Sequence, residues 1–193
     1  MDYIIRKARE TDSFNIARTL AYCFKKVFSP LTKDPERMAK VFENGVATER
    51  FYVAEQGDVI IGVIACADCT GRVLGATQSD CKKHLGFLRG SIAFRVLCSQ
   101  LMRPHTYPAT TGVIDVVGVL QQARGRGVAK EMLRIIIENN PQYNEFVLDV
   151  DSINASAIKS YTGFGFTEFK RIPVVRFFKR SKIIMRYTVR EDE

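Results

Sequence analysis

A turn of sequence Arg-Gly-Arg-Gly stands between an apolar strand-like stretch and an apolar helix-like stretch. Gly125 and Gly127 carry no Cβ atom, so a ligand can lie directly against the backbone there. The first N–H groups of the following helix have no partner within it, and the helix dipole adds positive potential. Arg124, Arg126 and Lys130 add mobile positive charge. This pattern predicts an anion site, and the pyrophosphate of a coenzyme is the ligand that fits it.

Other glycine motifs fit this turn less well. A Rossmann G-x-G-x-x-G needs a third glycine where Lys130 stands, and a Walker loop needs Gly-Lys-Ser/Thr. Arg-Gly repeats also occur in disordered segments that bind nucleic acid, but such a tail does not sit between a strand and a helix. A plain strand-to-helix turn without a ligand remains the alternative.

A second pattern follows about 30 residues later. Asn154 and Tyr161 are seven residues apart, so on a helix they share one face. Asn154 suits the N-cap of that helix, alone or together with a ligand contact. By itself, Tyr161 is best explained as a core aromatic residue with a satisfied hydroxyl.

Together the two patterns resemble the GNAT superfamily of N-acetyltransferases, which use acetyl-coenzyme A. The family signature Gln/Arg-x-x-Gly-x-Gly/Ala is matched in two frames, 124–129 and 122–127, after the apolar triplet Val117-Gly-Val119. The second signature (Asn, Ala, Tyr, then Gly-Phe) is matched over 154–166. The resemblance covers residues 1–70 and 111–190, and 71–110 lies outside it.

The resemblance implies acetyl-CoA as co-substrate. The amides from Gly125 to Lys130 would hold the pyrophosphate, and 117–119 would pair with the pantetheine arm like an added strand. A backbone N–H near Val117 would polarise the thioester carbonyl, and Gly118 would leave room for the arm. The implied binding residues are Val117, Gly118, Val119, Arg124, Gly125, Arg126, Gly127, Val128, Ala129, Lys130 and Asn154.

The resemblance also implies catalytic roles, none of which needs a metal. Tyr161 would be the general acid that protonates the departing thiolate, since thiols have a pKa of ~8.5 and tyrosine ~10. Asp149 stands where some protein N-terminal acetyltransferases of the family carry a glutamate base, and Asp115 is the second candidate. A water chain, or an amine that arrives neutral, would need neither carboxylate.

The acceptor is a primary amine whose identity stays open between a small amine, a peptide N-terminus and a lysine side chain. The basic residues of 71–110 hint at an anionic acceptor. A non-catalytic acyl-CoA-binding or interaction module is the alternative function. A nucleic-acid binder is a third, less favoured hypothesis, because the basic run Arg176–Lys182 is better explained as a solvated hairpin loop.

Length and pattern predict one α/β domain over residues 1–193, with a mixed, part-parallel sheet of about six or seven strands flanked by helices. A helical insertion is expected at about 78–105. The strand Val113–Val119 is almost wholly apolar and should be buried on both faces. The short helix from Asn154 should stop at Gly163.

The composition limits the classes of partner and cellular location that are expected. The net charge of +8 favours anionic partners, and no apolar run approaches the ~20 residues that span a bilayer. Without a signal-peptide pattern, a cytoplasmic location with free thiols is expected, and a homodimer is open. Cys66 and Cys69 form a C-x-x-C that could bind zinc or act in redox chemistry, but bystander thiols are favoured. His105, between two prolines, is expected in a loop.

Overall fold

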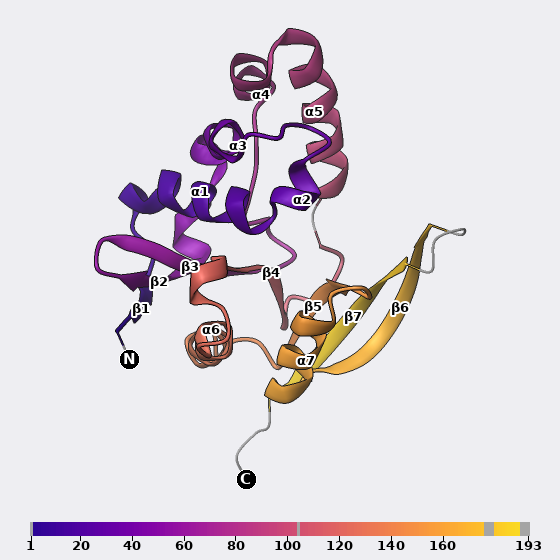
Figure 1. The fold of residues 1–193 in the computed structure, drawn as a ribbon. Coiled ribbons are helices and arrows are strands. Elements are labelled where there is room, and N and C mark those ends of the chain that lie inside the picture. Colours follow the sequence, from indigo (N-terminus) through magenta and orange to yellow (C-terminus); the bar gives the residue numbers. More distant parts are fainter. Residues whose placement is uncertain (1, 104, 176–179, 190–193) are drawn as a thin grey trace.

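The computed structural model describes residues 2–103, 105–175 and 180–189 and forms one seven-stranded sheet of order β1-β2-β3-β4-β5-β7-β6 (Figure 1). Only the β4–β5 pair is parallel, and all other neighbours are antiparallel. The expected mixed α/β sheet is therefore confirmed. The strands are β1 (Ile4–Lys7), β2 (Phe51–Gln56), β3 (Val59–Ala67), β4 (Thr111–Val119), β5 (Glu145–Asp151), β6 (Thr167–Val175) and β7 (Arg180–Thr188).

Capping and turn residues fix the start of α3 and the turn of the β2–β3 hairpin. At α3 the Asp34 side chain accepts a hydrogen bond from the Glu36 N–H at 2.9 Å, and Pro35 fills the first helical position. The β2–β3 hairpin turns at Gly57, whose φ is +59°. The α-helices of the described residues are α1 (Ser13–Cys23), α2 (Lys25–Phe28), α3 (Pro35–Phe42), α4 (Gln78–Leu85), α5 (Phe87–Gln100), α6 (Val128–Glu138) and α7 (Ala155–Phe164).

The sheet buries a separate apolar core on each face. Helix α1 lies against one face, with α3 and then the α4–α5 pair packed beyond it, and α6 and α7 cover the other face (Figure 1). Phe42 and Met38 are fully buried in the first core, and Met132 and Phe146 are fully buried in the second. Because both faces are covered there, the inner strands β2 to β5 contribute alternate side chains to the two cores.

The helices α4 and α5 form a hairpin in the connection between β3 and β4. Gly86, with φ +87°, makes the turn between them. Gly90 lets the helices approach closely, because a Cβ there would lie 2.4 Å from the Cys81 carbonyl oxygen. The hairpin packs through Cys81, Leu85 and Leu97 onto the α1 side of the sheet.

The strands β4 and β5 separate partway along their length. Their pairing runs from Thr111 with Glu145 to Ile114 with Leu148 and then ends. Beyond that point β4 continues to Val119 on the β3 side, whereas β5 continues along β7. The divergence opens a gap in the middle of the sheet.

Two local expectations were wrong. Gly163 does not stop α7, which runs to Phe164 and ends at Gly165, where φ is +122°. A positive φ is what a helix-ending glycine supplies, and Gly163 adopts an ordinary helical conformation instead. The strand β4 is continuously buried only from Thr111 to Ile114, and residues 115–117 and 119, which lie beyond its pairing with β5, are partly exposed.

Other expectations fall partly outside the described residues. The basic run 176–182, expected as a loop, includes four positions, 176–179, that the structure does not describe, and its last three residues, 180–182, begin the strand β7 instead. None of the helices in the described ranges is long and apolar enough to span a bilayer.

The close approach of β4 and β5 generates a stability prediction at Gly112. An added Cβ would lie 2.7 Å from ring carbons of both Phe146 and Tyr143, which are buried and cannot move away freely. Gly112→Ala should therefore lower the free energy of unfolding by about 1–3 kcal/mol, as overpacking does. Chemical or thermal denaturation followed by circular dichroism measures the change.

Gly163→Ala is the matched control, because a Cβ at that helical position meets nothing within 4 Å. It should leave stability unchanged or raise it by up to ~1 kcal/mol, as alanine in place of a helical glycine does. Equal melting curves for Gly112→Ala and the wild type would show that the strand pair is not tightly packed there.

Candidate functional site

A cavity of about 450 Å³ occupies the gap where β4 and β5 diverge. Its walls come from the end of β4, the glycine turn, the start of α6, one face of α7 and the end of α1. The lining residues are Cys23, Phe24, Val117, Gly118, Val119, Ala123, Arg124, Gly125, Gly127, Val128, Ala129, Lys130, Asn154, Ser156, Ala157, Lys159, Ser160 and Tyr161. The structure thus brings together all the sequence-predicted binding residues except Arg126, and adds Tyr161.

The glycine turn presents a row of free backbone donors to this cavity. Gly125 and Gly127 have φ of +75° and +80°, and a Cβ at either would meet nothing within 4 Å. Gly127 is the N-cap of α6. Across the described chain, no acceptor takes a hydrogen bond from any N–H between Gly125 and Lys130. Six consecutive open donors at a helix N-terminus are suited to an anion.

The basic side chains around the turn differ in direction. Arg124 lines the cavity and donates from Nε to the Val119 carbonyl oxygen at 3.0 Å. Lys130 lines it as well. The Arg126 side chain points elsewhere: it donates to Gln56 Oε1 at 3.2 Å and lies 5.8 Å from the Tyr3 ring centre. Only the backbone of Arg126 can therefore take part in the anion site.

The free edge of β4 directs main-chain groups into the gap. The Leu120 N–H donates to the Ile61 carbonyl oxygen, so Leu120 faces the neighbouring antiparallel strand. Main-chain groups alternate along a strand, which turns Gly118 toward β3 and both Val117 and Val119 toward the gap. The Val117 N–H is therefore an open donor in the cavity wall.

The helix α7 contributes Asn154 and Tyr161 from one face. Asn154 Oδ1 accepts from the Ala157 N–H at 3.2 Å, so the residue caps α7. The same residue also lines the cavity. Tyr161 is only 9% exposed, and its ring packs 6.1 Å from that of Phe166. Burial, helped by the negative charge of Asp149, raises the pKa of Tyr161 to about 12. The hydroxyl is a proton donor throughout the neutral pH range.

The two predicted carboxylates lie in different environments. Asp149 follows Leu148, the last β5 residue paired with β4, and its side chain is 50% exposed with Lys182 Nζ at 3.0 Å. Asp115 is 5% exposed and is held by Arg72 and His105, with Arg72 Nη2 2.7 Å from its Oδ1. Neither carboxylate lines the cavity.

The remaining cysteines and His84 stay away from the cavity. Cys66 is buried in β3, which raises its pKa to about 12, and Cys69 is exposed just after that strand. Within the described ranges, no group of three or more His, Cys, Asp and Glu side chains is arranged to hold a metal ion.

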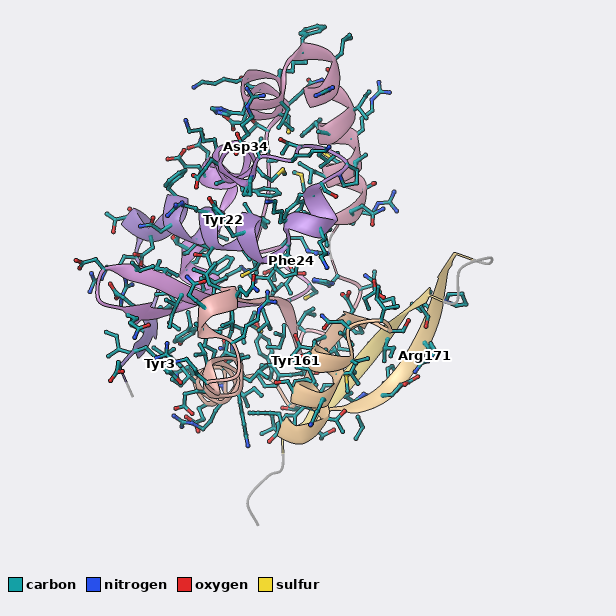
Figure 2. All side chains as sticks on the ribbon, viewed as in Figure 1. Tyr3, Tyr22, Phe24, Asp34, Tyr161 and Arg171 are labelled. Atoms are coloured by element: carbon teal, nitrogen blue, oxygen red, sulfur yellow. The ribbon has the colours of Figure 1, made fainter. Side chains whose placement is uncertain are left out.

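Sequence reasoning missed several lining residues. Ser156, Ala157, Lys159 and Ser160 belong to α7, and its helical period could have identified Ala157, which lies three residues after Asn154 and four before Tyr161. Cys23 and Phe24 come from the end of α1, about 100 residues away in sequence, with no local signal. Figure 2 shows Phe24 and Tyr161 in the middle of the molecule, on the α1 and α7 sides of the gap.

Gly118 has a packing role that its sequence did not indicate. A Cβ there would lie 3.2 Å from Cys23 Sγ and 3.5 Å from Val63 Cγ2. The glycine therefore lets the end of α1 approach β4 beside the cavity. Burial raises the pKa of Cys23 to about 11, so its thiol stays protonated near neutral pH.

Comparisons with known proteins agree with this geometry. The profile of the acetyltransferase (GNAT) family matches residues 20–166. N-alpha-acetyltransferase 30 of Saccharomyces cerevisiae is 32% identical over 73 residues, which are 37% of this chain and 42% of the yeast protein. The match thus spans less than half of that relative.

Solved structures show the same fold. The N-acetyltransferase of Staphylococcus aureus Mu50 has a TM-score of 0.63 at 18% identity, covering 95% of this chain and 100% of that one. The yncA acetyltransferase of Salmonella typhimurium, solved with its cofactor acetyl-CoA, has a TM-score of 0.61 at 18% identity, covering 100% of this chain and 96% of that one.

Asn154 both caps α7 and lines the cavity, and the contribution of the cap to stability can be tested by itself. Asn154→Ala removes the oxygen that accepts from the Ala157 N–H and should cost about 1 kcal/mol of stability. Asn154→Ser keeps a capping oxygen and should stay within a few tenths of a kcal/mol of the wild type. Urea unfolding measures both. Equal stability of the two variants would show that the cap contributes nothing.

Proposed function

This chain belongs to the GNAT family of acetyltransferases, and from that premise we propose that it transfers an acetyl group from acetyl-CoA to a primary amine by direct attack. One observation carries the proposal: the open N–H groups of Gly125 and of Gly127 to Lys130 border a cavity that also contains the free edge of β4 and the Tyr161 side chain. Hydrogen-bond donors for a diphosphate, a free strand edge for an amide-bearing arm and a proton donor are thereby close together.

The cavity walls suit the successive parts of acetyl-CoA. The donors from Gly125 to Lys130 take the pyrophosphate, with Lys130 adding charge. The Val117–Val119 edge, which lacks a β5 partner, pairs with the amide-bearing pantetheine arm. Asn154 retains one lone pair for the ligand beyond its capping bond. The Val119 carbonyl oxygen and Asn154 Oδ1 already accept one hydrogen bond each, from Arg124 and Ala157, whereas the backbone donors of the turn have no partner in the described chain.

The reaction uses the same wall. The amine nitrogen attacks the thioester carbonyl carbon, a C–N bond forms, and the C–S bond breaks as the oxyanion collapses. The Val117 N–H donates to that oxyanion. Tyr161 gives its proton to the departing thiolate, and the proton that the attacking nitrogen loses passes to solvent, which reprotonates the tyrosinate.

The absence of a carboxylate from the cavity lining favours an α-amino acceptor. Asp149 lies near Tyr161 beyond the point of strand divergence, but its carboxylate is half exposed and paired with Lys182. An α-amino group with a pKa of about 8 is roughly one-tenth neutral at pH 7, whereas a lysine amine is neutral in fewer than one part in a thousand. The yeast relative, named as an N-alpha-acetyltransferase, supports the same acceptor class.

A non-catalytic acyl-CoA-binding module is the second candidate, favoured by the absence of a strong base from the cavity lining. It predicts binding of acetyl-CoA without release of free thiol. Calorimetry with acetyl-CoA, followed by a thiol-release assay with peptide and amine acceptors, separates the two candidates.

Removing the Tyr161 hydroxyl should slow the chemical step selectively. Tyr161→Phe should lower kcat by roughly 10²-fold or more, because a positioned acid contributes on that scale. The Kd for acetyl-CoA should change little, since the ring stays in place. Steady-state thiol release and calorimetry measure the two quantities, and an unchanged kcat would remove Tyr161 from the mechanism.

The same variant should also change how the free energy of unfolding depends on pH. The folded-state pKa of Tyr161, about 12, exceeds the unfolded value of about 10, so the unfolded chain releases this proton first. The stabilisation is complete below pH 10 and is lost as pH rises from 10 to 12. Tyr161→Phe should lack this component of alkaline destabilisation, in denaturation curves compared with the wild type.

Acceptor class can be tested with matched peptides. A peptide with a free N-terminus and no lysine should be acetylated, and the same peptide with a blocked N-terminus and one lysine should react at least tenfold more slowly near pH 7, because far less of its amine is neutral. Mass spectrometry locates the acetyl group. Preferential lysine acetylation, or transfer only to small amines, would overturn the α-amino assignment.

A further inference from the structure

We propose that Arg72 and His105 act through Asp115 as positioning residues, which hold a bulge in β4 so that the Val117 N–H faces the thioester. The inference rests on the proposed function, and it assigns a role to residues that lie at the two ends of the segment between β3 and β4. The two residues are 33 positions apart in sequence, and both contact one buried carboxylate.

The bulge is located by strand register. Ala65 pairs with Val116, whereas the next β3 residue, Cys66, pairs with Ile114. Asp115 is therefore the additional residue on β4, as in a β-bulge. It also directly follows Ile114, the last β4 residue paired with β5. The bulge and the divergence of the strands occur at the same residue.

The bulge residue is held from both ends of the inserted segment. Arg72 contacts Asp115 through two nitrogens, with Nε 2.9 Å from Oδ2 and Nη2 2.7 Å from Oδ1. His105 Nε2 lies 3.3 Å from Oδ1. Arg72 Nη1 also donates to the Arg103 carbonyl oxygen at 3.1 Å, which ties the two connections together. Planar two-point pairing fixes direction as well as distance.

The bulge decides which way the open edge of β4 faces. Side chains and main-chain groups alternate along a strand, so a shift of one residue reverses both. Beyond the bulge, Val117 and Val119 direct their main-chain groups into the cavity. If the extra residue relaxed into the ladder, Val117 would turn its N–H toward β3. The contacts of Arg72 and His105 with Asp115 therefore determine that the Val117 N–H faces the cavity and not β3.

The contacts also distinguish this role from that of a general base. Both Asp115 oxygens already lie within hydrogen-bond distance of a donor, and the side chain is 5% exposed and absent from the cavity lining. A base must reach the attacking amine directly or through one water. The geometry fits a carboxylate that holds backbone, and Asp149 stays the candidate base.

The test compares Arg72→Gln, Asp115→Asn and the double variant. Each single variant should lower kcat at least tenfold and leave the acetyl-CoA Kd within about twofold, because the glycine turn that binds the pyrophosphate is elsewhere. The double variant should be no worse than the poorer single variant, since both break one clamp. His105→Gln, which can place an amide nitrogen near the position of Nε2, should retain more kcat than His105→Ala.

Arg50→Gln is the matched control. Arg50 is 23% exposed, close to the 18% of Arg72, but its ion-pair partners are Asp68, at 3.1 Å, and Glu49 instead of Asp115. It should lower the melting temperature without changing kcat. All rates are taken below the melting transition of each variant, and the two His105 variants supply the comparison where Arg72→Gln does not fold.

Any of the following results would overturn the inference. One is a kcat loss in the Arg72 and Asp115 variants no larger than in Arg50→Gln, and a second is equal kcat in His105→Gln and His105→Ala. Another is parallel loss of kcat and acetyl-CoA affinity. The last is inactivity of Asp115→Asn alone while Arg72→Gln works with an acid limb moved to higher pH, as expected for a base. Failure of the wild type to bind or transfer would instead reject the proposed function.

Discussion

The end of pairing between β4 and β5 is the constraint on which the site depends. After Ile114 and Leu148, each strand keeps its outer neighbour and loses its inner one. The edge of β4 is thereby left with unsatisfied main-chain groups in the centre of the protein, where such groups are costly unless a partner fills the space. The helices α6 and α7 cover the same face, so their N-terminal segments converge on this edge (Figure 1).

Much of the site could be predicted because its geometry depends on residues that are close together in sequence. The glycine turn follows a strand directly and precedes a helix, so its donors and its positive φ values could be inferred from neighbouring residues. Asn154 and Tyr161 share a face because helical periodicity requires it. The sheet class followed from the order of strand-like and helix-like stretches, which the structure confirms.

Other features depend on long-range packing and carry no local signal. Nothing near Cys23 in sequence indicates that it meets Gly118, and nothing near Arg126 indicates that its side chain turns to Gln56. The two glycines near the end of α7 are equally plausible helix stops, and only the packing of Gly165 against Tyr187 identifies the one that ends it. The burial of Asp115 likewise depends on partners outside its own strand.

The four residue pairs that join β4 to β5 have a further consequence for the lifetime of the folded chain. They are the direct ladder between the β1–β4 half of the sheet and the β5–β7–β6 half. Under the proposed function, a bound donor bridges the two halves and stabilises the folded state by mass action. Loss of the bound acetyl-CoA would then lower the free energy of unfolding and shorten the lifetime of the folded chain.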